Sequence, residues 1–581
     1  MAARPLLFAF LACLLVFSFW SLIVKPALAS DYIDVSVSEA RAMIETNPSL
    51  VLLDVRNQSE YDAGHIRNAK LIPLWELATR LDELNKTDEI LVYCGVGGRS
   101  INASRILASD GFLHVYNMLG GTTEWVREGY PVYIKYLSVQ EAIRNASPGA
   151  TIRVSAGLYT EQLLTIDKAL VFEGENKYTT IINATTNTTI QVNADNVSIS
   201  DFTLQYSGGC ACFGDSVVNV TGSGNINVTN NVIVSDDFGI RVEDARNLTI
   251  AYNSITRTGN TFIVVLNSSE VLLLENNVMA ADGMELDNCA ESVFSGNTIF
   301  NIWGAGIFAY QSNQNTFSGN EIISNASAAI SISNCYNNTF LGNNISSNGQ
   351  YGLFFWQSNN NSFFHNNFLG NSGQVSNYKN SSAFWDNGLE GNYWSDYTGA
   401  DTGNDGIGDT AYDPINRSID TTNDTTNRDN HPLMGLFHSY ATPLNHTVNV
   451  VSNSTINDVE YVESNRTIVL QVSNTTADQT IGFCRISIPH YLIDPYNGSI
   501  SVVIDNGQTP VLFLNNTLYD DGTYRWIYFT YPQTTHSISV VSEFPVSLIL
   551  AAFMIVTVIA ATAYRKRRID LSRNSSILVA I

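Results

Sequence analysis

Short apolar runs alternate with segments of helical periodicity over residues 33–135. Residues 51–55 and 89–93 are apolar runs that predict buried strands. Helices are expected from Ser36 or Ser38 to Ile44, over 76–84 and over 100–108. This alternation of strands and helices favours an α/β fold with a parallel sheet.

A different pattern follows this segment and repeats itself. Alternating apolar and polar residues end on an asparagine, and these asparagines recur every 21 to 23 residues. They are Asn231, Asn253, Asn276, Asn297, Asn320, Asn343 and Asn366. Such a period marks a solenoid, and strand and turn residues without helical periodicity predict a right-handed parallel β-helix over 136–435. The asparagines should stack from turn to turn as an internal hydrogen-bonded ladder.

Two cysteines test the register of this β-helix. Cys289 and Cys335 each precede a ladder asparagine by eight residues, and Ser312 holds the same place in the turn between them. Neighbouring strands lie about 4.8 Å apart, so the two thiols should be roughly 10 Å apart, too far for a disulfide. We interpret them as small packed residues. Cys210 and Cys212 lie in a glycine-rich insertion and stay ambiguous.

The N-terminal end of the chain has the pattern of a targeting segment. Residues 6–24 are almost wholly apolar, and Ala27-Leu28-Ala29 then offers small residues for cleavage. This predicts a signal peptide over 1–29 and a mature start near Ser30. An uncleaved signal anchor is the alternative, because the apolar run is long enough to span a bilayer.

The C-terminal end predicts a membrane anchor. Residues 440–541 alternate short β-rich runs with turn residues, which predicts a small β-sandwich that acts as a spacer. Residues 544–564 are apolar and are followed at once by four basic residues. They predict a single transmembrane helix with a cytoplasmic tail over 565–581 and the rest of the chain outside the cytoplasm.

The composition fits an exposed surface protein. The chain has 581 residues, enough for several domains, and a formal net charge of −24 with only 14% charged residues. A nucleic-acid partner is not expected, since such proteins carry a basic patch. Glycosylation sequons are dense, for example at Asn145, Asn183, Asn196, Asn247, Asn325 and Asn465. Together with the short basic tail they suggest a glycosylated archaeal surface protein.

The segment with the clearest chemistry is Cys94-Gly95-Val96-Gly97-Gly98-Arg99-Ser100. It lies between the strand that ends at Tyr93 and the following helix, where reactive sites of open α/β sheets are found. The glycines let several backbone N–H groups turn inward, and the helix N-terminus adds to this anion pocket. A thiolate in such a pocket is stabilised, so the pKa of Cys94 should fall. Arg99 adds a cation for an anionic donor.

This segment resembles the active loop of the rhodanese family, C-x-x-G-x-R, and three further motifs agree. Leu53-Asp54-Val55-Arg56 looks like the family's Asp-x-Arg strand end, and residues 60–66 (EYDAGHI) with Asn68-Ala69 look like its turn. Residues 119–125 (LGGTTEW) with 129–132 (GYPV) resemble its C-terminal motif. The resemblance covers about 100 residues, 33–135.

The resemblance implies a mechanism. Cys94 attacks the sulfane sulfur of a donor such as thiosulfate and becomes a persulfide, cradled by the N–H groups of the loop. A thiophilic acceptor (cyanide, a thiol or a partner protein) then takes the sulfur, and no cofactor is required. Asp54 and Arg56 are expected to hold the loop by an ion pair, and His65 is expected to be structural. Related phosphatases carry C-x5-R, whereas the loop here is C-x4-R, so sulfur is favoured over phosphate.

The opening of the β-helix, over residues 138–161, resembles pectate-lyase-like β-helices, which include a NosD-like group. A copper role is poorly supported, because His365 is the single histidine in the repeats. Asp237, Asp282 and Glu285 allow a hydrolytic alternative with carboxylates about 10 Å apart, although turn-forming aspartates are the favoured interpretation. Binding of polysaccharide or a stalk-like role is expected instead.

A segment after the repeats carries oxygen ligands around glycines. The stretch 385–409 resembles the terminal cap of archaeal NosD-like repeat proteins. Within it, Asp401, Asn404, Asp405 and Asp409 offer oxygen ligands of the type that binds calcium, although the spacing is not that of an EF-hand. A solvated cluster of turns is the alternative.

Two hypotheses of function follow. The first is an extracytoplasmic, membrane-anchored sulfurtransferase with a β-helix module for binding polysaccharide or a surface. The second is a carbohydrate-binding or adhesion protein whose rhodanese domain is not catalytic.

Overall fold

A computed structural model describes residues 32–186, 188–206, 216–235, 238–256, 261–280, 282–301, 303–325, 327–346, 349–378, 381–414, 427–493 and 500–542. The chain divides into one unit of Met1–Arg241 with Leu248–Thr256 and a second of Val242–Asn247 with Arg257–Ile581. The predicted signal peptide, transmembrane helix and tail lie outside the described residues, as do Cys210 and Cys212. Within the described ranges, no helix is long and apolar enough to cross a bilayer.

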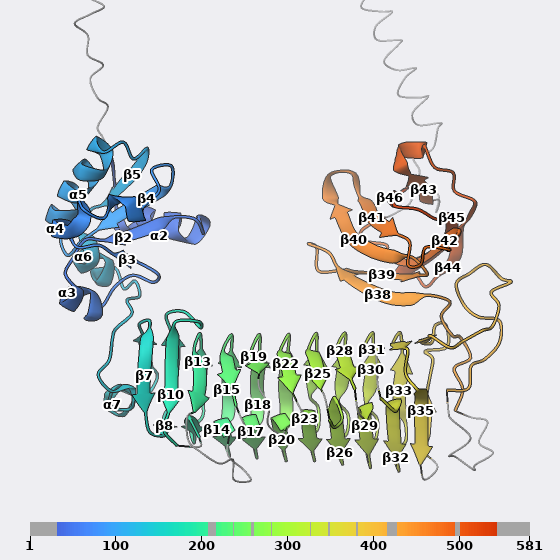
Figure 1. The fold of residues 1–581 in the computed structure, drawn as a ribbon. Coiled ribbons are helices and arrows are strands. Elements are labelled where there is room, and N and C mark those ends of the chain that lie inside the picture. The colour runs from blue at the N-terminus through green and yellow to red at the C-terminus, as the bar shows by residue number, and fades with distance from the viewer. Residues whose placement is uncertain are drawn as a thin grey trace, which may run out of the picture. The chain divides into compact units, whose positions relative to one another are not determined.

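The first unit begins with a parallel sheet of strand order β1-β5-β4-β2-β3 (Figure 1). The strands are β1 (Ile33–Val35), β2 (Val51–Asp54), β3 (Lys70–Leu71), β4 (Glu89–Tyr93) and β5 (His114–Met118). The helices are α2 (Val37–Thr46), α3 (Gln58–Asp62), α4 (Leu74–Leu77), η1 (Leu81–Glu83), α5 (Gly98–Ser109) and α6 (Gly121–Arg127). Two apolar clusters bury the sheet, one of them built around Leu53, Val92 and Leu107.

Local signals explain where these helices begin and end. Ser36 and Glu39 form a reciprocal capping box at the start of α2. The helix expected over 76–84 is wrong as one element, because α4 ends at Leu77 and a separate 3-10 turn follows. The Thr79 hydroxyl donates to the Glu76 carbonyl at 2.8 Å, and such side-chain bonds compete with the helical backbone pattern.

A parallel β-solenoid follows helix α7 (Val139–Asn145), and each of its three sheets takes every third strand of the chain. The first sheet holds β6 (Ala150–Val154), β9 (Leu170–Gly174), β12 (Val197–Ser200), β15 (Gly224–Thr229), β18 (Arg246–Ala251), β21 (Ser269–Leu274), β24 (Val293–Ser295), β27 (Thr316–Ser318), β30 (Thr339–Leu341), β33 (Asn361–Phe364) and β36 (Ala383–Phe384). The second holds β7 (Gly157–Glu161), β10 (Thr180–Ala184), β13 (Thr203–Tyr206), β16 (Val232–Val234), β19 (Ser254–Thr256), β22 (Asn277–Ala280), β25 (Thr298–Asn301), β28 (Glu321–Ser324), β31 (Asn344–Ser346), β34 (Asn367–Leu369) and β37 (Tyr393–Trp394). The third holds β8 (Leu164–Ile166), β11 (Ile190–Val192), β14 (Ser216–Thr221), β17 (Phe238–Glu243), β20 (Thr261–Leu266), β23 (Asp282–Asp287), β26 (Ile307–Tyr310), β29 (Ala328–Ser333), β32 (Tyr351–Trp356) and β35 (Gly373–Tyr378).

The predicted asparagine ladder is present inside the solenoid. In the first unit, the Asn231 side chain donates to Asn253 at 3.2 Å. In the second unit, each side-chain amide donates to the next at 2.8 to 3.0 Å, from Asn276 through Asn297, Asn320, Asn343 and Asn366 to Asn392. These bonds satisfy buried amides that would otherwise destabilise the core.

Two further ladders run beside it in the second unit. Asn315, Asn338 and Asn361 repeat the same amide bonds at 3.0 to 3.1 Å. The other ladder contains Cys289, Ser312, Cys335 and Ser358. In it, the Cys289 N–H donates to the Ser312 hydroxyl and the Cys335 N–H to the Ser358 hydroxyl, each at 3.0 Å. Both Cys289 and Cys335 are free and buried, and burial raises the pKa of each thiol to about 11.

The second unit ends in two antiparallel sheets that pack as a sandwich, with strand orders β38-β39-β42-β45-β44 and β40-β41-β46-β43. The elements are β38 (Leu436–Ala441), β39 (Thr447–Ser452), β40 (Thr455–Val462), η2 (Glu463–Asn465), β41 (Thr467–Ser473), β42 (Ile481–Pro489), β43 (Ile500–Ile504), η4 (Asp505–Gly507), β44 (Phe513–Asp520), β45 (Tyr524–Pro532) and β46 (His536–Ser542). The first strand begins four residues earlier than the predicted boundary of 440. Asn367 of the solenoid exchanges two 2.8 Å bonds with the Phe437 backbone, and this fixes the early start.

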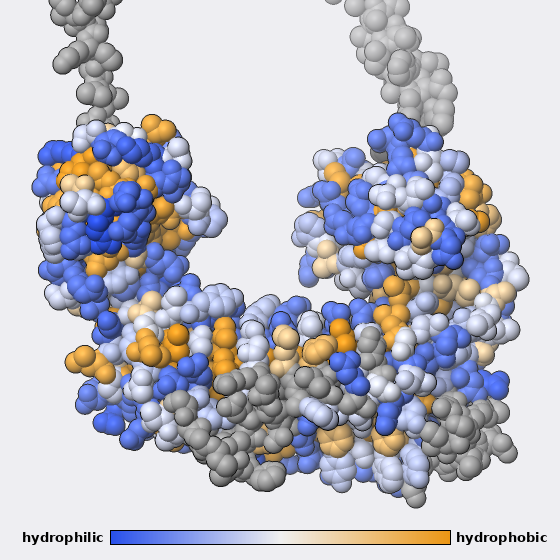
Figure 2. Space-filling view, in the orientation of Figure 1, coloured by the Kyte–Doolittle hydropathy of each residue, from blue (hydrophilic) through white to orange (hydrophobic). Residues whose placement is uncertain are grey.

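Polar and apolar side chains share the outside of the molecule. Figure 2 shows apolar side chains interspersed with hydrophilic ones over the face of the solenoid that it presents. This mixture fits strands whose alternate residues point outward in a water-exposed solenoid.

Candidate active site

Cys94 follows β4 directly and lies at the carboxyl end of the parallel sheet. Its side chain is buried, with 1% of the residue exposed. The Gly97 N–H donates to the Cys94 sulfur at 3.2 Å. Gly97 has φ of 103°, a conformation that suits glycine, and it caps α5, which begins at Gly98 rather than near Ser100. The loop therefore turns a backbone donor onto the thiol.

The surroundings of Cys94 favour its thiolate. Burial raises the pKa of the thiol. This effect is outweighed by hydrogen bonds from the Ser100 N–H and hydroxyl and from the N–H groups of Gly97 and Val96, so the pKa of Cys94 is lowered overall. The Ser100 hydroxyl lies 3.7 Å from the sulfur and donates to the Gly97 carbonyl at 3.0 Å. A thiolate is the reactive form of cysteine as a nucleophile.

Arg99, expected as a cation for an anionic donor, has a carboxylate partner. Its guanidinium donates to both Glu60 oxygens, at 2.7 and 2.6 Å. The bond from Arg99 is the main reason that the pKa of Glu60 falls to about 2. The positive charge at the mouth of the loop is therefore compensated, and sequence reasoning did not give Glu60 this role.

Asp54 and Arg56 form a buried ion pair beside the loop, with 2.6 Å between Arg56 Nη2 and Asp54 Oδ2. Arg56 also donates to the Thr122 hydroxyl at 3.3 Å. The Thr122 N–H in turn donates to the Cys94 carbonyl at 2.8 Å. This chain of contacts connects the pair to the backbone of the nucleophile.

Gly121 is a site residue to which sequence reasoning gave no separate role. Its φ is 58°, and a Cβ added there would lie 2.2 Å from the Cys94 carbonyl oxygen. The N-terminus of α6 can therefore approach the active loop only if this residue is glycine. The paired glycines Gly120-Gly121 in the sequence were the signal that could have indicated this close approach.

His65 connects the domain to the solenoid within the first unit. Its ring is buried, and Nε2 lies 3.0 Å from Glu175 Oε2 while Nδ1 lies 2.9 Å from the Tyr61 carbonyl. Glu175 also accepts from the N–H groups of Asn68 and Ala156, at 2.7 and 2.8 Å. The histidine expected as structural thus makes a contact between domains.

The acidic segment Asp401–Asp409 satisfies its carboxylates within its own loop. Asp401 accepts from the N–H groups of Asp405 and Gly406, and Asp409 accepts from that of Thr402. No group of three or more His, Cys, Asp or Glu suited to a metal occurs in the described ranges. Calcium binding by Asp401, Asn404, Asp405 and Asp409 stays a prediction.

Two of the solenoid carboxylates, Asp282 and Glu285, belong to β23. Asp282 and Glu285 line a cavity of about 310 Å³, and burial is the main reason that the pKa of each carboxyl is raised. Asp237, the third carboxylate of the hydrolytic alternative, lies outside the described residues. A catalytic pair with it therefore has no geometry to support it.

Residues 36–128 match the family of the rhodanese-like domain. Over 97 residues the chain is 37% identical to the protein YrkF of Bacillus subtilis, a match that covers 17% of this chain and about half, 52%, of YrkF. It is 32% identical over 83 residues to a sulfurtransferase of Allochromatium vinosum, covering 14% of this chain and 78% of that protein. A solved rhodanese-related protein of Thermoplasma volcanium is 31% identical, covering 18% of this chain and 100% of that one, with a TM-score of 0.17.

The fold around Cys94 and the sequence matches to the rhodanese-like family and to the Allochromatium vinosum protein define a protein with a rhodanese-like, sulfurtransferase-type domain. The chain belongs to the rhodanese-like family through this N-terminal domain.

The solenoid matches a second family, described as periplasmic copper-binding protein (NosD), over residues 143–301 and 263–399. The side chains of the described residues do not fit copper. His365 of the repeats pairs with Glu390 at 2.9 Å, and the part of the chain that the structure describes has no metal-suited group of three His, Cys, Asp or Glu.

Proposed function

We propose that this protein is an extracytoplasmic, membrane-anchored sulfurtransferase that carries sulfur on Cys94. The observation that supports this most is the thiol itself, which is held by the N–H of Gly97 and has a lowered pKa despite its burial. A lowered pKa supplies the thiolate that sulfur transfer requires.

In the first step, the Cys94 thiolate attacks the outer sulfur of thiosulfate. A sulfur–sulfur bond forms to Cys94, the sulfur–sulfur bond of thiosulfate breaks, and sulfite leaves with that electron pair. The product is a Cys94 persulfide anion, whose charge the loop N–H groups can stabilise. No proton or external oxidant is needed.

In the second step, a nucleophile such as cyanide attacks the outer sulfur of the persulfide. Thiocyanate forms, and the electron pair returns to Cys94 as a thiolate. Cys94 is the single cysteine of residues 33–135. The acceptor must therefore come from outside the domain.

A turnover assay with thiosulfate and cyanide tests the proposal on the full chain. The wild type should form thiocyanate, and Cys94→Ala should reduce turnover to background. Cys289→Ser is the matched control, because Ser312 already occupies the equivalent place in the next turn. An inactive wild type, or a Cys94→Ala variant that keeps its activity, would refute the enzymatic role.

The location is proposed from the two apolar ends of the sequence and from the periplasmic family that the solenoid matches. Protease added to intact cells should degrade the chain up to the segment 544–564 and leave a short protected fragment. Full protection in intact cells with degradation only after lysis would place the chain inside and contradict the proposal.

We infer a second role for the solenoid, the binding of polysaccharide. Exposed aromatic residues on the third sheet favour it, among them Phe308 and Tyr378, which are 37% and 43% exposed. Aromatic rings offer apolar faces on which sugars can stack, and most surface positions of a soluble protein do not carry aromatic residues.

A further inference from the structure

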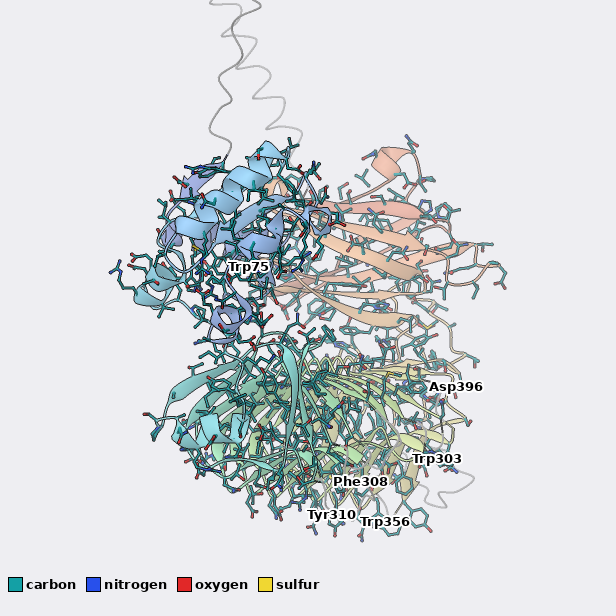
Figure 3. All side chains as sticks on the ribbon, turned by 60° about the vertical axis from the view of Figure 1, so that its left-hand side comes forward. Trp75, Trp303, Phe308, Tyr310, Trp356 and Asp396 are labelled. Atoms are coloured by element: carbon teal, nitrogen blue, oxygen red, sulfur yellow. The ribbon has the colours of Figure 1, made fainter. Side chains whose placement is uncertain are left out.

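The outer face of the third sheet carries aromatic residues in register. Phe308 and Tyr310 point outward from β26, and Phe354 and Trp356 point outward from β32. In Figure 3, Phe308, Tyr310 and Trp356 lie together at the lower edge of the solenoid. Both strands belong to the second unit, so the arrangement is internal to one unit.

A strand of small residues separates these two aromatic strands. The register of β29 places Ser331 between Phe308 and Phe354, and Ser333 between Tyr310 and Trp356. Neighbouring strands lie about 4.8 Å apart, so the two aromatic strands are roughly 9.6 Å apart. Ser331 and Ser333 are much smaller than the aromatic side chains of the strands on either side.

The ring of Trp356 has one face toward this space. Its other face stacks on Tyr378, with 4.9 Å between ring centroids and an interplanar angle of 6°. Since Tyr378 lies on the far side of Trp356 from Ser333, the second face of the indole is turned toward the serine strand. A ring inserted there would lie roughly 4.8 Å from each wall, within the range of stacked ring pairs.

The charges on this face limit what can insert. Glu285 lies beside Phe308 and Asp287 beside Tyr310, on β23. Residues 282–378 contain no lysine or arginine. An anionic polymer would meet the carboxylates of β23, and strands β23, β26, β29 and β32 carry no lysine or arginine to pair with it, which costs binding free energy.

We propose that Phe308, Tyr310, Phe354 and Trp356 form a slot, floored by Ser331 and Ser333, that binds a pyranose ring of a neutral polysaccharide. The apolar faces of the sugar ring meet the aromatic walls, and its hydroxyl edges meet the serines below. The carboxylates of β23 accept hydroxyls of the next sugar along the chain. This inference rests on the proposed polysaccharide binding and assigns it a site and a substrate class.

Native gel electrophoresis of the full chain in detergent, with glycans cast in the gel, tests the slot. The probes are a neutral β-glucan, a neutral galactomannan and acidic polygalacturonate. The wild type should be retarded by a neutral glycan and not by polygalacturonate. Trp356→Ala should weaken the retardation roughly tenfold in apparent affinity, as expected for loss of a stacked ring. Trp75→Ala is the matched control, because Trp75 is 65% exposed on the rhodanese domain.

Ser333→Tyr gives the sharper variant. A tyrosine there would extend the stack from Tyr310 to Trp356 and fill the slot, so retardation should be lost while the thermal unfolding midpoint is not lowered. Retardation equal to that of the wild type in both variants would overturn the slot and leave glycan binding elsewhere.

The remaining outcomes of the gel assay also decide the matter. No retardation by either neutral glycan would overturn both the slot and polysaccharide binding. Preference for polygalacturonate would overturn the neutral substrate class. Binding of a tryptophan-rich peptide in place of the glycans, lost in Ser333→Tyr, would assign the slot to a protein partner and overturn the proposal.

Discussion

At the scale of single residues, the loop holds the Cys94 sulfur by the N–H of Gly97 and pairs Arg99 with Glu60. The sequence around Cys94 contains the glycines that turn N–H groups inward, so a lowered pKa could be predicted. The partner of Arg99 could not, because Glu60 lies 39 residues away and a local motif does not indicate which charges meet.

Ser100 contributes to the lowered pKa of Cys94 through its N–H and its hydroxyl. Ser100→Ala removes the hydroxyl alone, so the thiolate loses part of its stabilisation and its pKa should rise. The folded chain is alkylated with iodoacetamide at a series of pH values, and the modified fraction is read from the peptide that contains Cys94. The alkylation rate should reach its half-maximum at a higher pH than in the wild type. An unchanged profile would show that the hydroxyl does not act on the thiolate.

The Arg99–Glu60 pair predicts an effect on donor binding. Glu60→Gln keeps a side chain that can accept the N–H of Asn57, but it leaves the charge of Arg99 uncompensated. The KM for thiosulfate, a dianion, should fall by roughly two- to fivefold at low salt, and the difference should shrink as salt rises. A KM that is unchanged at all salt concentrations would mean that Arg99 does not contribute to donor binding.

At the scale of elements, periodic features were predictable and interruptions were not. The spacing of Asn231 to Asn366 predicted the ladder, because one residue type must repeat at one place in every turn. The second ladder through Asn315 was missed, although its 23-residue spacing is equally regular. The break after Leu77 was missed because apolar spacing does not report the Thr79 hydroxyl bond.

Loss of one ladder amide should destabilise the solenoid. Asn320 is buried, donates to Asn343 at 2.8 Å and accepts from Asn297 at 3.0 Å. Asn320→Ala leaves these buried partners unsatisfied, so the free energy of unfolding should fall by about 1–3 kcal/mol. Calorimetry of the full chain checks this against Gln350→Ala, since Gln350 is an exposed amide side chain of the same solenoid. Equal transitions in the two variants would contradict a stabilising ladder.

At the scale of the whole molecule, the attachment of the rhodanese domain to the solenoid could not be predicted. His65 belongs to a local family motif, and its partner Glu175 lies 110 residues away. Short-range patterns do not reveal such pairs. The succession of an α/β domain and a solenoid could be predicted, since the alternation of strands and helices gives way to a regular repeat along the sequence.

The contact between His65 of the rhodanese domain and Glu175 of the solenoid should depend on pH. Burial raises the pKa of Glu175, but His65 and the N–H groups of Ala156 and Asn68 lower it below its ordinary value. A carboxyl with a depressed pKa stabilises the folded contact above its unfolded pKa, and this contribution is lost as pH falls through the folded value. The protection factors of the backbone N–H groups of residues 65–68, which correct for the intrinsic pH dependence of exchange, should therefore fall below about pH 4. Glu175→Gln should flatten that dependence, and a wild type whose protection factors do not fall in acid would contradict it.

The central claim is that Cys94 carries sulfur, and intact-mass spectrometry after exposure to thiosulfate tests it most directly. The account predicts that the full chain gains the mass of one sulfur atom, that peptide mapping places it on Cys94, and that cyanide removes it as thiocyanate. A wild-type chain that gains no sulfur, or that gains it equally in Cys94→Ala, would contradict the account.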